Sequence, residues 1–593
     1  MGFHFKCFIS PGPKNIMHPD AKADAKAGAM LSIEVAVKLL YRLKQGHHEE
    51  VIAEAGKLIR QYPKVAGLHE ILGTAHATAG NLQKAETCLR RALKLDPGQQ
   101  SALFNLGGLY LNSGKHGQAV VAFRQFLKRD PDNGAALFHL GEALFYSDMT
   151  DKAIEPLRRA AELSSEHTEA RFLLGQIFRG AGEDDLALAY FQSVLEIEPS
   201  HYEATFNIGN IHRDYRRNDE ALAVYSSLRS GQPDHLPLLL NIHACHLQSM
   251  DLEAATDVND RVLEIEPGNA NGIYNASCLE FLAGRWKLGY ALYEKRFEKD
   301  NPVTPLYSGR EPGWDGKGVI SGGRLVLHAE QGLGDSIMMM RFLSLIDHER
   351  ETPVVLIQPA LEALAAQSFP DIHFERIDRH RKGWKKNGEH GVAQCSLVSL
   401  PHVLRDRWQD IPSAQGYLLP PDDVVAVWKH WLEDGNTSPA IGLAWRGNPK
   451  NPYERHRCVD VEFLASHLPH GPRYVVLQKD MTDAEYDFLS SYRGLDISVT
   501  ALGDFCTTAA LCANLDMVVT VDTSAAHLCG ALGTPTAVLL PFSPDSRWGA
   551  AGRNSDWYNS VTLYRQTRTG DWAAPLAILA KNIEALGHSS LFG

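Results

Sequence analysis

The sequence predicts an α-helical solenoid followed by an α/β region made of two halves. Two observations support this prediction. Prolines and glycines recur every 34 residues through the first half of the chain, and strand-length apolar runs alternate with helical stretches through the second. With 593 residues the chain is too long for a single hydrophobic core, so several domains are expected.

Composition and charge exclude several classes of protein. A net charge of −12 and the lack of a basic stripe argue against nucleic acid as a partner. No run of 18 apolar residues occurs, so no membrane span is expected. Nine scattered cysteines without a C-x-x-C pair indicate reduced thiols, a cytoplasmic location and no structural zinc. Residues 1–30 are polar and proline-rich, which predicts a flexible leader.

Residues 31–300 predict about seven helix–turn–helix repeats. The glycines let the two helices of a repeat approach closely, and the proline ends the second helix because it lacks an N–H group. Such units stack into a solenoid because none can bury its own apolar face. The periodic prolines are Pro63, Pro97, Pro131, Pro199, Pro233 and Pro267, and the glycines of the first helices are Gly73, Gly107, Gly141, Gly175 and Gly209.

The run ALFNLGGLYLNSGKHGQAVVAFRQFLKRDP resembles the tetratricopeptide consensus, which implies a right-handed superhelix. One position of the first helix is asparagine in four repeats, while His139 and Leu173 interrupt the series. An amide both donates and accepts, which suits the backbone of an extended peptide. These asparagines equally suit hydrogen bonds between helices. The series resembles the asparagine-lined groove of the protein O-linked N-acetylglucosamine transferases, which implies that an acceptor protein binds at Asn105, Asn207, Asn241 and Asn275.

Residues 301–320 break the periodicity with proline and glycine and are expected to form a linker. The alternation beyond it predicts parallel βαβ units in two halves, 321–430 and 431–593. Ligands of such sheets bind beyond the carboxyl ends of the strands. The expected strands lie in RLVLHAE, VVLIQP, QCSLVSL, AIGLAWRG, RYVVLQK, MVVTVD and TAVLLP.

Four polar motifs follow these strands. In the first, Gly334 allows close backbone approach at a strand-to-helix turn and Asp335 stands at the helix start, where an aspartate often only caps the helix. The second motif contains Trp445, Arg446 and Asn448, and the third contains Gln478 and Lys479. These two motifs could hold phosphate or acceptor.

The fourth motif, VVTVDTSAAHLCGALGTP, leads from a buried strand into a helix whose N-terminus favours an anion. Asp522 is expected to cap and orient the loop, Ser524 begins the helix, and Thr523 and His527 point a hydroxyl and an imidazole toward the same oxygens. A lone histidine is more often structural, but this context favours anion binding.

The runs HAEQGLGD, WRGNPKNPYERHR, LQK, GDFCTTAAL, VDTSAAHLCGALGTP and PFSPDSRWG occur in this order. Together with the repeats they resemble bacterial tetratricopeptide proteins fused to a heptosyltransferase-like glycosyltransferase of the GT-B type, built from two Rossmann-like halves. The resemblance implies that Asp335 is the general base, and that Asp522, Thr523 and His527, with Lys479, bind and neutralise the donor's diphosphate. No D-x-D motif occurs in the C-terminal half, so no metal is expected.

The function expected from this resemblance is transfer of a sugar from a nucleotide-activated donor to a protein held by the repeats. Some members of this architecture modify flagellin, which makes flagellin a candidate acceptor. The donor stays open among ADP-, UDP- and CMP-sugars; it is a co-substrate, and no other cofactor is expected. Two alternatives also stay open: a repeat scaffold with an inactive transferase domain, and transfer to a cell-envelope saccharide.

Overall fold

The structure, a computed structural model, describes residues 33–589 apart from 165, 301, 304–305, 310, 318–323, 331, 381–391, 413–414, 434–437, 450–453, 493–494 and 497–503. The leader expected at residues 1–30 therefore lies outside the described residues, as does part of the linker expected at 301–320. The chain divides into two compact units. One comprises Met1–Asp214 with Ala223–Leu228, and the other Tyr215–Leu222 with Arg229–Gly593.

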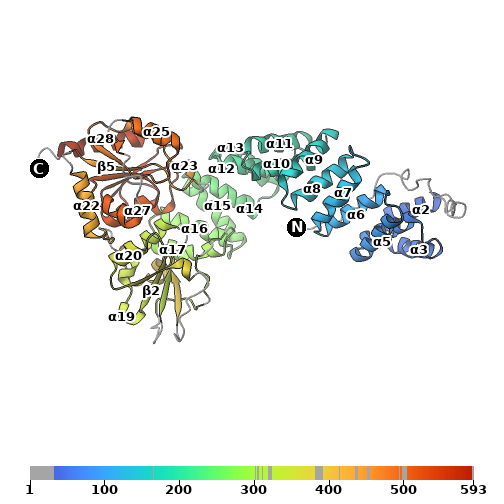
Figure 1. Cartoon of the computed structure of the whole chain (residues 1–593), viewed down its shortest axis with the longest axis horizontal. Coiled ribbons are helices and arrows are strands. Elements are labelled where there is room, and N and C mark those ends of the chain that lie inside the picture. The colour runs from blue at the N-terminus through green and yellow to red at the C-terminus, as the bar shows by residue number, and fades with distance from the viewer. Residues whose placement is uncertain are drawn as a thin grey trace. The chain divides into compact units, whose positions relative to one another are not determined.

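The first half of the chain is a succession of helix pairs (Figure 1). Within the part of the chain that the structure describes they make eight pairs where the sequence predicts about seven repeats, because α2 and α3 also form a pair. The second helices of the pairs end before the periodic prolines, as predicted. The helices are α2 (Ile33–Lys44), α3 (His48–Gln61), α4 (Ala66–Thr78), α5 (Leu82–Leu95), α6 (Gln100–Asn112), α7 (His116–Leu127), α8 (Gly134–Phe145), α9 (Thr150–Leu163), α10 (Thr168–Gly180), α11 (Asp184–Ile197), α12 (Tyr202–Asp214), α13 (Asn218–Gly231), α14 (Leu236–Gln248), α15 (Leu252–Ile265), α16 (Ala270–Leu282) and α17 (Trp286–Tyr293).

The periodic glycines of the first helices each face a large side chain of the paired helix. A Cβ added to Gly107 would lie under 3.0 Å from the ring of Phe123, and the same holds for Gly175 and the ring of Phe191. Gly73, Gly141 and Gly209 face their partners in the same way. The glycines are therefore required by packing, and the predicted close approach of the paired helices is confirmed.

The turn inside each pair contains a residue with positive φ. This residue is glycine in several repeats, for example Gly114 with φ 70° and Gly284 with φ 73°. At the same place in other repeats stand Asp148, Arg216 and Met250, with φ between 55° and 57°. Because a left-handed backbone costs a residue with a Cβ about 1–2 kcal/mol, these turns are strained.

The second half of the chain contains two parallel sheets (Figure 1). Their strand orders are β3-β2-β1-β4 and β10-β9-β8-β5-β6-β7. All seven strands expected from the sequence are present, and β3, β7 and β10 are additional. The strands are β1 (Leu325–His328), β2 (Pro353–Ile357), β3 (His373–Arg376), β4 (Ala393–Ser396), β5 (Ala440–Ala444), β6 (Arg473–Val476), β7 (Leu495–Asp496), β8 (Met517–Val521), β9 (Thr536–Leu540) and β10 (Val561–Arg565).

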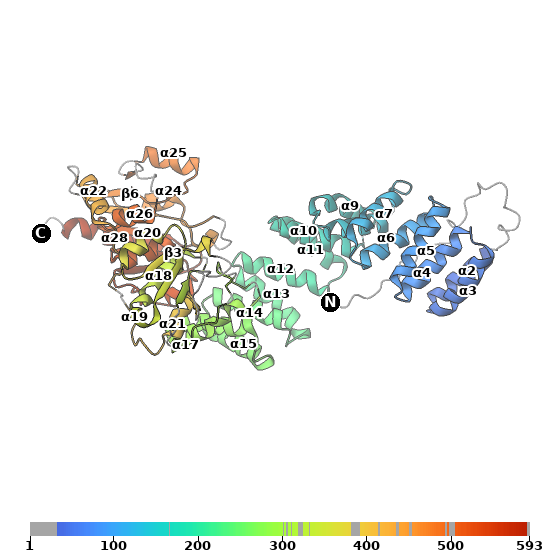
Figure 2. The ribbon, with the colours of Figure 1, turned by 60° about the horizontal axis from the view of Figure 1, so that its bottom comes forward.

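Helices cover these sheets, and α27 and α28 lie on opposite sides of the larger one (Figure 1). Helix α17 contacts α21, so the last repeat adjoins the smaller sheet's region (Figure 2). The helices are η2 (Glu294–Phe297), α18 (Leu333–Met340), η3 (Arg341–Leu345), α19 (His348–Glu351), α20 (Glu362–Ser368), η4 (Ile377–Arg379), η5 (Leu397–Ser399), α21 (Leu400–Val403), α22 (Asp422–Leu432), α23 (Glu454–Arg457), α24 (Val461–His467), α25 (Asp483–Ser491), α26 (Phe505–Cys512), α27 (Ser524–Leu532), η6 (Ser546–Trp548) and α28 (Ala573–Ser589).

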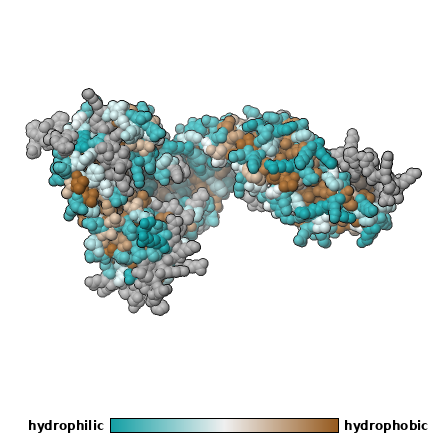
Figure 3. Space-filling view, viewed as in Figure 1, coloured by the Kyte–Doolittle hydropathy of each residue, from teal (hydrophilic) through white to brown (hydrophobic). Residues whose placement is uncertain are grey.

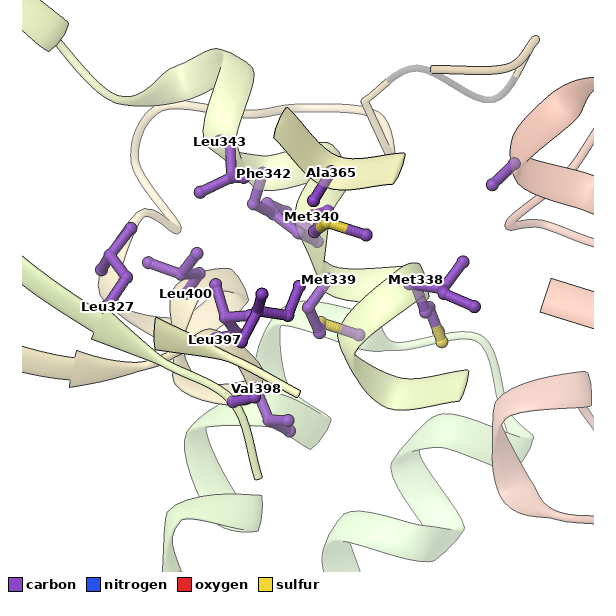
Figure 4. Packing of buried hydrophobic residues seen from close by; sticks show 14 of the residues in the cluster. Leu327, Met338, Met339, Met340, Phe342, Leu343, Ala365, Leu397, Val398 and Leu400 are labelled. Carbon is purple, nitrogen blue, oxygen red and sulfur yellow. The ribbon is translucent and has the colours of Figure 1, made fainter. Parts of the chain in front are cut away.

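The core beside the smaller sheet is built from α18 and its neighbours (Figure 4). Met339 of α18 and Leu397 of η5 pack together there, and Met340 and Phe342 are fully buried beside them. This packing anchors α18, whose N-terminus follows β1. The start of α18 is therefore held rigidly at the carboxyl end of the sheet.

The visible surface mixes hydrophilic residues with small hydrophobic patches (Figure 3). Within the described part of the chain, no helix combines the length and apolar character that crossing a membrane requires. The cytoplasmic location expected from the cysteines stays a prediction.

Replacing Met250 by glycine is expected to stabilise the protein. The change removes the left-handed strain of about 1–2 kcal/mol but adds up to ~1 kcal/mol of backbone entropy to the unfolded chain. The free energy of unfolding is therefore expected to rise by about 0.5–1 kcal/mol, as measured by urea unfolding followed by circular dichroism.

Gly284→Ala is the matched control, because Gly284 occupies the same turn position one repeat later. An added Cβ there would meet only Asp556 Oδ2, at 3.7 Å. The free energy of unfolding of this variant should be lower than that of the wild type by a similar amount. Equal stability of all three proteins would show that these turns carry no strain.

Candidate functional site

The predicted polar residues all follow strands at their carboxyl ends. Asp335 lies in α18 after β1, and the other motifs follow β5, β6 and β8. These last three strands are neighbours in the larger sheet. The strand order reverses between β5 and β8, the place where ligands bind in sheets of this kind. The second, third and fourth motifs are therefore gathered at the carboxyl end of the larger sheet, while Asp335 follows a strand of the smaller sheet.

Asp335 stands in the first turn of α18, after the N-cap Gly332. Its carboxylate folds back over Gly332, where an added Cβ would collide with Oδ2. Arg547 of η6 donates from Nη1 to Asp335 Oδ1. Arg547 also donates to Asp545 from Nε at 2.8 Å and from Nη2 at 2.9 Å. The carboxylate expected to act as a base is thus ion-paired, and Arg547 links it to Asp545.

His527 lies one turn into α27 and is 4% exposed. Its Nδ1 is 3.0 Å from the hydroxyl oxygen of Tyr558, and its ring stacks on Trp548 at 5.2 Å between centroids. Burial and the charge of Arg341 lower the pKa of His527 to about 3. The imidazole is therefore neutral at physiological pH.

Gly334 brings the first and fourth motifs together. A Cβ added to Gly334 would lie 2.8 Å from His527 Cδ2 and 3.6 Å from Nε2. Helices α18 and α27 pack against each other at this point. Because Asp335 adjoins Gly334 in the chain, the predicted base and the predicted anion-binding histidine lie in one cluster.

The cap of α27 differs from the expectation. Thr523, rather than Asp522, is the N-cap, and its hydroxyl accepts from Ala525 N at 3.3 Å. The backbone of Thr523 is extended (φ −140°), which places its oxygen over the helix start. Asp522 is 7% exposed, and burial raises its pKa. Ser524 is the first helical residue and is half-buried.

The second and third motifs are held together by their own contacts. Gln478 Oε1 accepts from the backbone N–H groups of Trp445 and Arg446 at 3.2 Å. Glu485 accepts from the Trp445 indole at 2.7 Å and from Arg446 Nε and Nη2 at 3.0 and 2.7 Å. These side chains order the loop after β5. Arg446, expected to hold phosphate or acceptor, is engaged by a carboxylate.

Glu485 is the shared hydrogen-bond acceptor of this arrangement. Burial alone would raise its pKa, but hydrogen bonds from Arg446, the backbone of Thr482 and Trp445 lower it to about 2. Glu485 therefore stays ionised and keeps its partners in place. Asn448 and Lys479, the remaining residues of the two motifs, are exposed.

Two of the four asparagines predicted to bind an acceptor form hydrogen bonds within the repeats. Asn105 is buried, and its Nδ2 donates to Thr74 Oγ1 at 3.2 Å and to Glu70 Oε1 at 3.3 Å. Asn207 Oδ1 accepts from Arg179 Nη1 at 2.7 Å. Both amides therefore form hydrogen bonds between helices, which is the alternative role that the sequence left open. Asn241 and Asn275 are half-buried, on α14 and α16.

Sequence reasoning assigned no role to Arg547, Asp545, Trp548, Arg341 or Tyr558, which complete the cluster. The run PFSPDSRWG contained a signal for the first three, since it follows β9 directly. The isolated arginine in SIMMMRFLSLI was a signal for Arg341, which is fully buried.

A cavity of about 690 Å³ lies elsewhere in the smaller sheet's region. It is bordered by the ends of β1 and β4, by η2 and by residues 302–303, 307–309 and 313–314. Tyr307 stacks on His328 in its wall, with ring centroids 4.8 Å apart. None of the residues predicted for the site lines this cavity. Among the described residues, no group of three or more His, Cys, Asp or Glu side chains could hold a metal ion.

The tetratricopeptide repeat family model matches the chain in five overlapping segments: 38–100, 72–123, 104–166, 147–201 and 187–235. The helix pairs of this part are therefore tetratricopeptide repeats. Repeats of this family bind peptides or proteins.

The chain is also similar to Protein FlbA of Caulobacter vibrioides, with 26% identity over 316 residues. The match covers 50% of this chain and 52% of that protein. The chain thus spans about half the length of this curated relative.

Several solved structures are similar to part of the chain. MamA is 28% identical, with a TM-score of 0.25, over 26% of this chain and 90% of its own. YrrB, described as a TPR protein with an unusual peptide-binding site, is 28% identical, with a TM-score of 0.29, over 31% of this chain and 95% of its own. A MamA fragment from Desulfovibrio magneticus RS-1 is 24% identical, with a TM-score of 0.27, over 30% and 99%.

Replacing His527 by glutamine is expected to make the second unit less sensitive to acid. Between pH 6.5 and 3 the unfolded chain binds a proton on this histidine that the folded chain does not, so the free energy of unfolding falls as the pH falls. Relative to the wild type, the variant should gain up to ~1.4 kcal/mol per pH unit below about pH 6.

The measurement is urea unfolding between pH 7 and 4.5, followed by tryptophan fluorescence. All ten tryptophans lie between residues 286 and 572, so the signal reports the second unit. His430→Gln, at an exposed histidine of α22, is the control and should keep the wild-type slope. A difference between His527→Gln and wild type that does not change with pH would contradict the neutral buried state.

Proposed function

We propose that this chain is a glycosyltransferase that moves a sugar from a nucleotide-activated donor to a protein bound by its repeats. The observation that carries the proposal is the cluster at the ends of β1 and β8. There a helix N-terminus, a neutral buried histidine and a carboxylate meet within one set of contacts.

The sheets support nucleotide binding. Read from β7, the larger sheet has the order β7-β6-β5-β8-β9-β10, the order of doubly wound dinucleotide-binding sheets. The smaller sheet, β3-β2-β1-β4, has the same order as the first four strands of such a sheet. We therefore infer a GT-B arrangement of two Rossmann-like halves, with the nucleotide against the larger sheet.

We place the donor's phosphate at the N-terminus of α27. The dipole of the helix and the N–H groups of its first turn attract an anion there. If Tyr558 donates its hydroxyl proton to His527 Nδ1, the neutral imidazole carries its proton on Nε2. Nε2 can then donate to a phosphate oxygen. Thr523 and Ser524 add hydroxyls at the same end of the helix.

In the transfer step, Asp335 removes the proton from the acceptor hydroxyl as that oxygen attacks the anomeric carbon. The bond from the anomeric carbon to the phosphate oxygen breaks, and the phosphate leaves with the electron pair. His527 and the helix N-terminus stabilise the charge that develops on it. General base catalysis of this kind contributes ~10²–10⁴-fold.

The repeats supply the acceptor side. Helix α16, which carries Asn275, contacts η6, which carries Arg547. The last repeat thus adjoins the cluster inside the second unit, so an acceptor held on α16 lies beside the reacting groups. Flagellin is the acceptor that the family resemblance favours, and the nucleotide base of the donor is left open.

A second candidate function is a protein-binding scaffold with an inactive transferase domain. The observation that favours it is the engagement of Asp335 by Arg547 and of Arg446 by Glu485. Both side chains must be available in an active transferase of the proposed kind, unless a ligand displaces their partners.

Thermal unfolding with ADP, UDP, GDP and CMP separates the two functions. We expect one nucleotide to stabilise the second unit, by ~2.7 kcal/mol at 100 times its Kd, in unfolding followed by tryptophan fluorescence. His527→Gln should lose most of this stabilisation, while His430→Gln should retain it. If no nucleotide raises the unfolding temperature, the scaffold is the better description.

A further inference from the structure

Arg547 is the residue that joins the predicted base to the rest of the cluster. Its Nη1 donates to Asp335, while Nε and Nη2 form a two-pronged pair with Asp545. The side chains of Arg547 and Asp335 are 27% and 33% exposed, so a ligand can reach both. One edge of the guanidinium is thus held by the neighbouring aspartate, and Nη1 contacts the part-exposed carboxylate of Asp335.

The backbone that carries Arg547 is firmly held. Arg565 donates to the carbonyl groups of Trp548 and of Gly549, the latter at 3.0 Å. Helix α16 also packs against η6. Exchange of partners at Arg547 therefore needs only a side-chain rotation.

The expected phosphate position is adjacent to both ends of the ion pair. Trp548, the residue after Arg547, stacks on His527. Gly334, the residue before Asp335, packs on the same imidazole. An anion bound at His527 therefore competes with Asp335 for Nη1, the guanidinium nitrogen that Asp545 does not hold, and a charge-assisted hydrogen bond to a phosphate oxygen is as favourable there as one to a carboxylate.

We propose that Arg547 binds the phosphate of the nucleotide donor and, in doing so, releases Asp335. This inference rests on the proposed function. Without donor, Asp335 is ion-paired to Arg547 through Oδ1, which makes it a weaker base toward a hydroxyl. With donor, the guanidinium turns to the phosphate, and Asp335 becomes free for the acceptor. Arg547 thus couples the base to the presence of the donor and imposes donor binding before transfer.

A double-mutant cycle in the full-length chain tests the exchange. The probes are ADP, UDP, GDP and CMP, with Kd measured by isothermal titration calorimetry. Asp335→Asn should bind the preferred nucleotide roughly fivefold more tightly than wild type, because Arg547 no longer has to leave an ion pair. Arg547→Gln should bind it about tenfold or more weakly, because a charge-assisted hydrogen bond is lost.

The decisive variant combines both changes. Asp335→Asn should bring no gain in the Arg547→Gln background, and a reduced gain in Arg547→Lys, which keeps the charge without the paired N–H groups. An equal gain in every background would mean that Asp335 only repels the anion, and it would overturn the exchange. Wild-type protein that binds none of the four probes would overturn the proposed function itself.

Discussion

The α/β region depends on the burial of one arginine. Arg341 is fully buried, and its hydrogen-bond partners are oxygens of carbonyl and hydroxyl groups, among them Met338 O at 3.0 Å and Trp557 O. The rings of Tyr417, Trp557 and Tyr558 surround the guanidinium at 4.5–5.3 Å. Removing a charge from water costs several kcal/mol, so every one of these partners must stay in place. Arg341 thereby fixes the end of α18 against the segment that carries Tyr558. Burial is the larger cause of the low pKa of His527, and the charge of Arg341 lowers it further, so the imidazole expected to face the phosphate stays neutral.

The repeats could be predicted from the sequence because each rule acts locally. A proline ends a helix wherever it stands, and a glycine such as Gly107 marks a close contact within one helix pair. The strained turns were not predicted, since Asp148 and Met250 break the glycine pattern and only the backbone angles reveal that the left-handed conformation persists. In the α/β region the buried strands were found by their apolar runs. Strand β3 was missed because its sequence, HFER, is largely polar and it contains an exposed residue.

The site could be located from the sequence but not assembled from it. Strand ends in a parallel sheet gather at one end of it, which brings the motifs after β5, β6 and β8 together without further information. Asp335 follows β1 of the other sheet, and its closeness to His527 is seen only in the packing of Gly334 on that imidazole. The partner of each side chain is a tertiary property. Arg446 pairs with Glu485 across 39 residues, and Asp335 pairs with Arg547 across 212. No local pattern encodes such pairs. The role of Gly334 was likewise visible only once His527 was seen packed against it.

The contacts of the asparagines bear on where an acceptor would be recognised. A peptide that binds Asn105 or Asn207 must first displace hydrogen bonds between helices, at a cost of about 1 kcal/mol for each bond. For Asn105 the cost is higher, because displacement would leave a buried polar group without a partner. Recognition along the whole series is therefore unfavourable, which directs attention to Asn275, the asparagine of the series nearest the α/β region. Asn275 lies on α16, which packs against the segment bearing Arg547. A peptide held there would gain effective concentration at the site without having to open the earlier repeats.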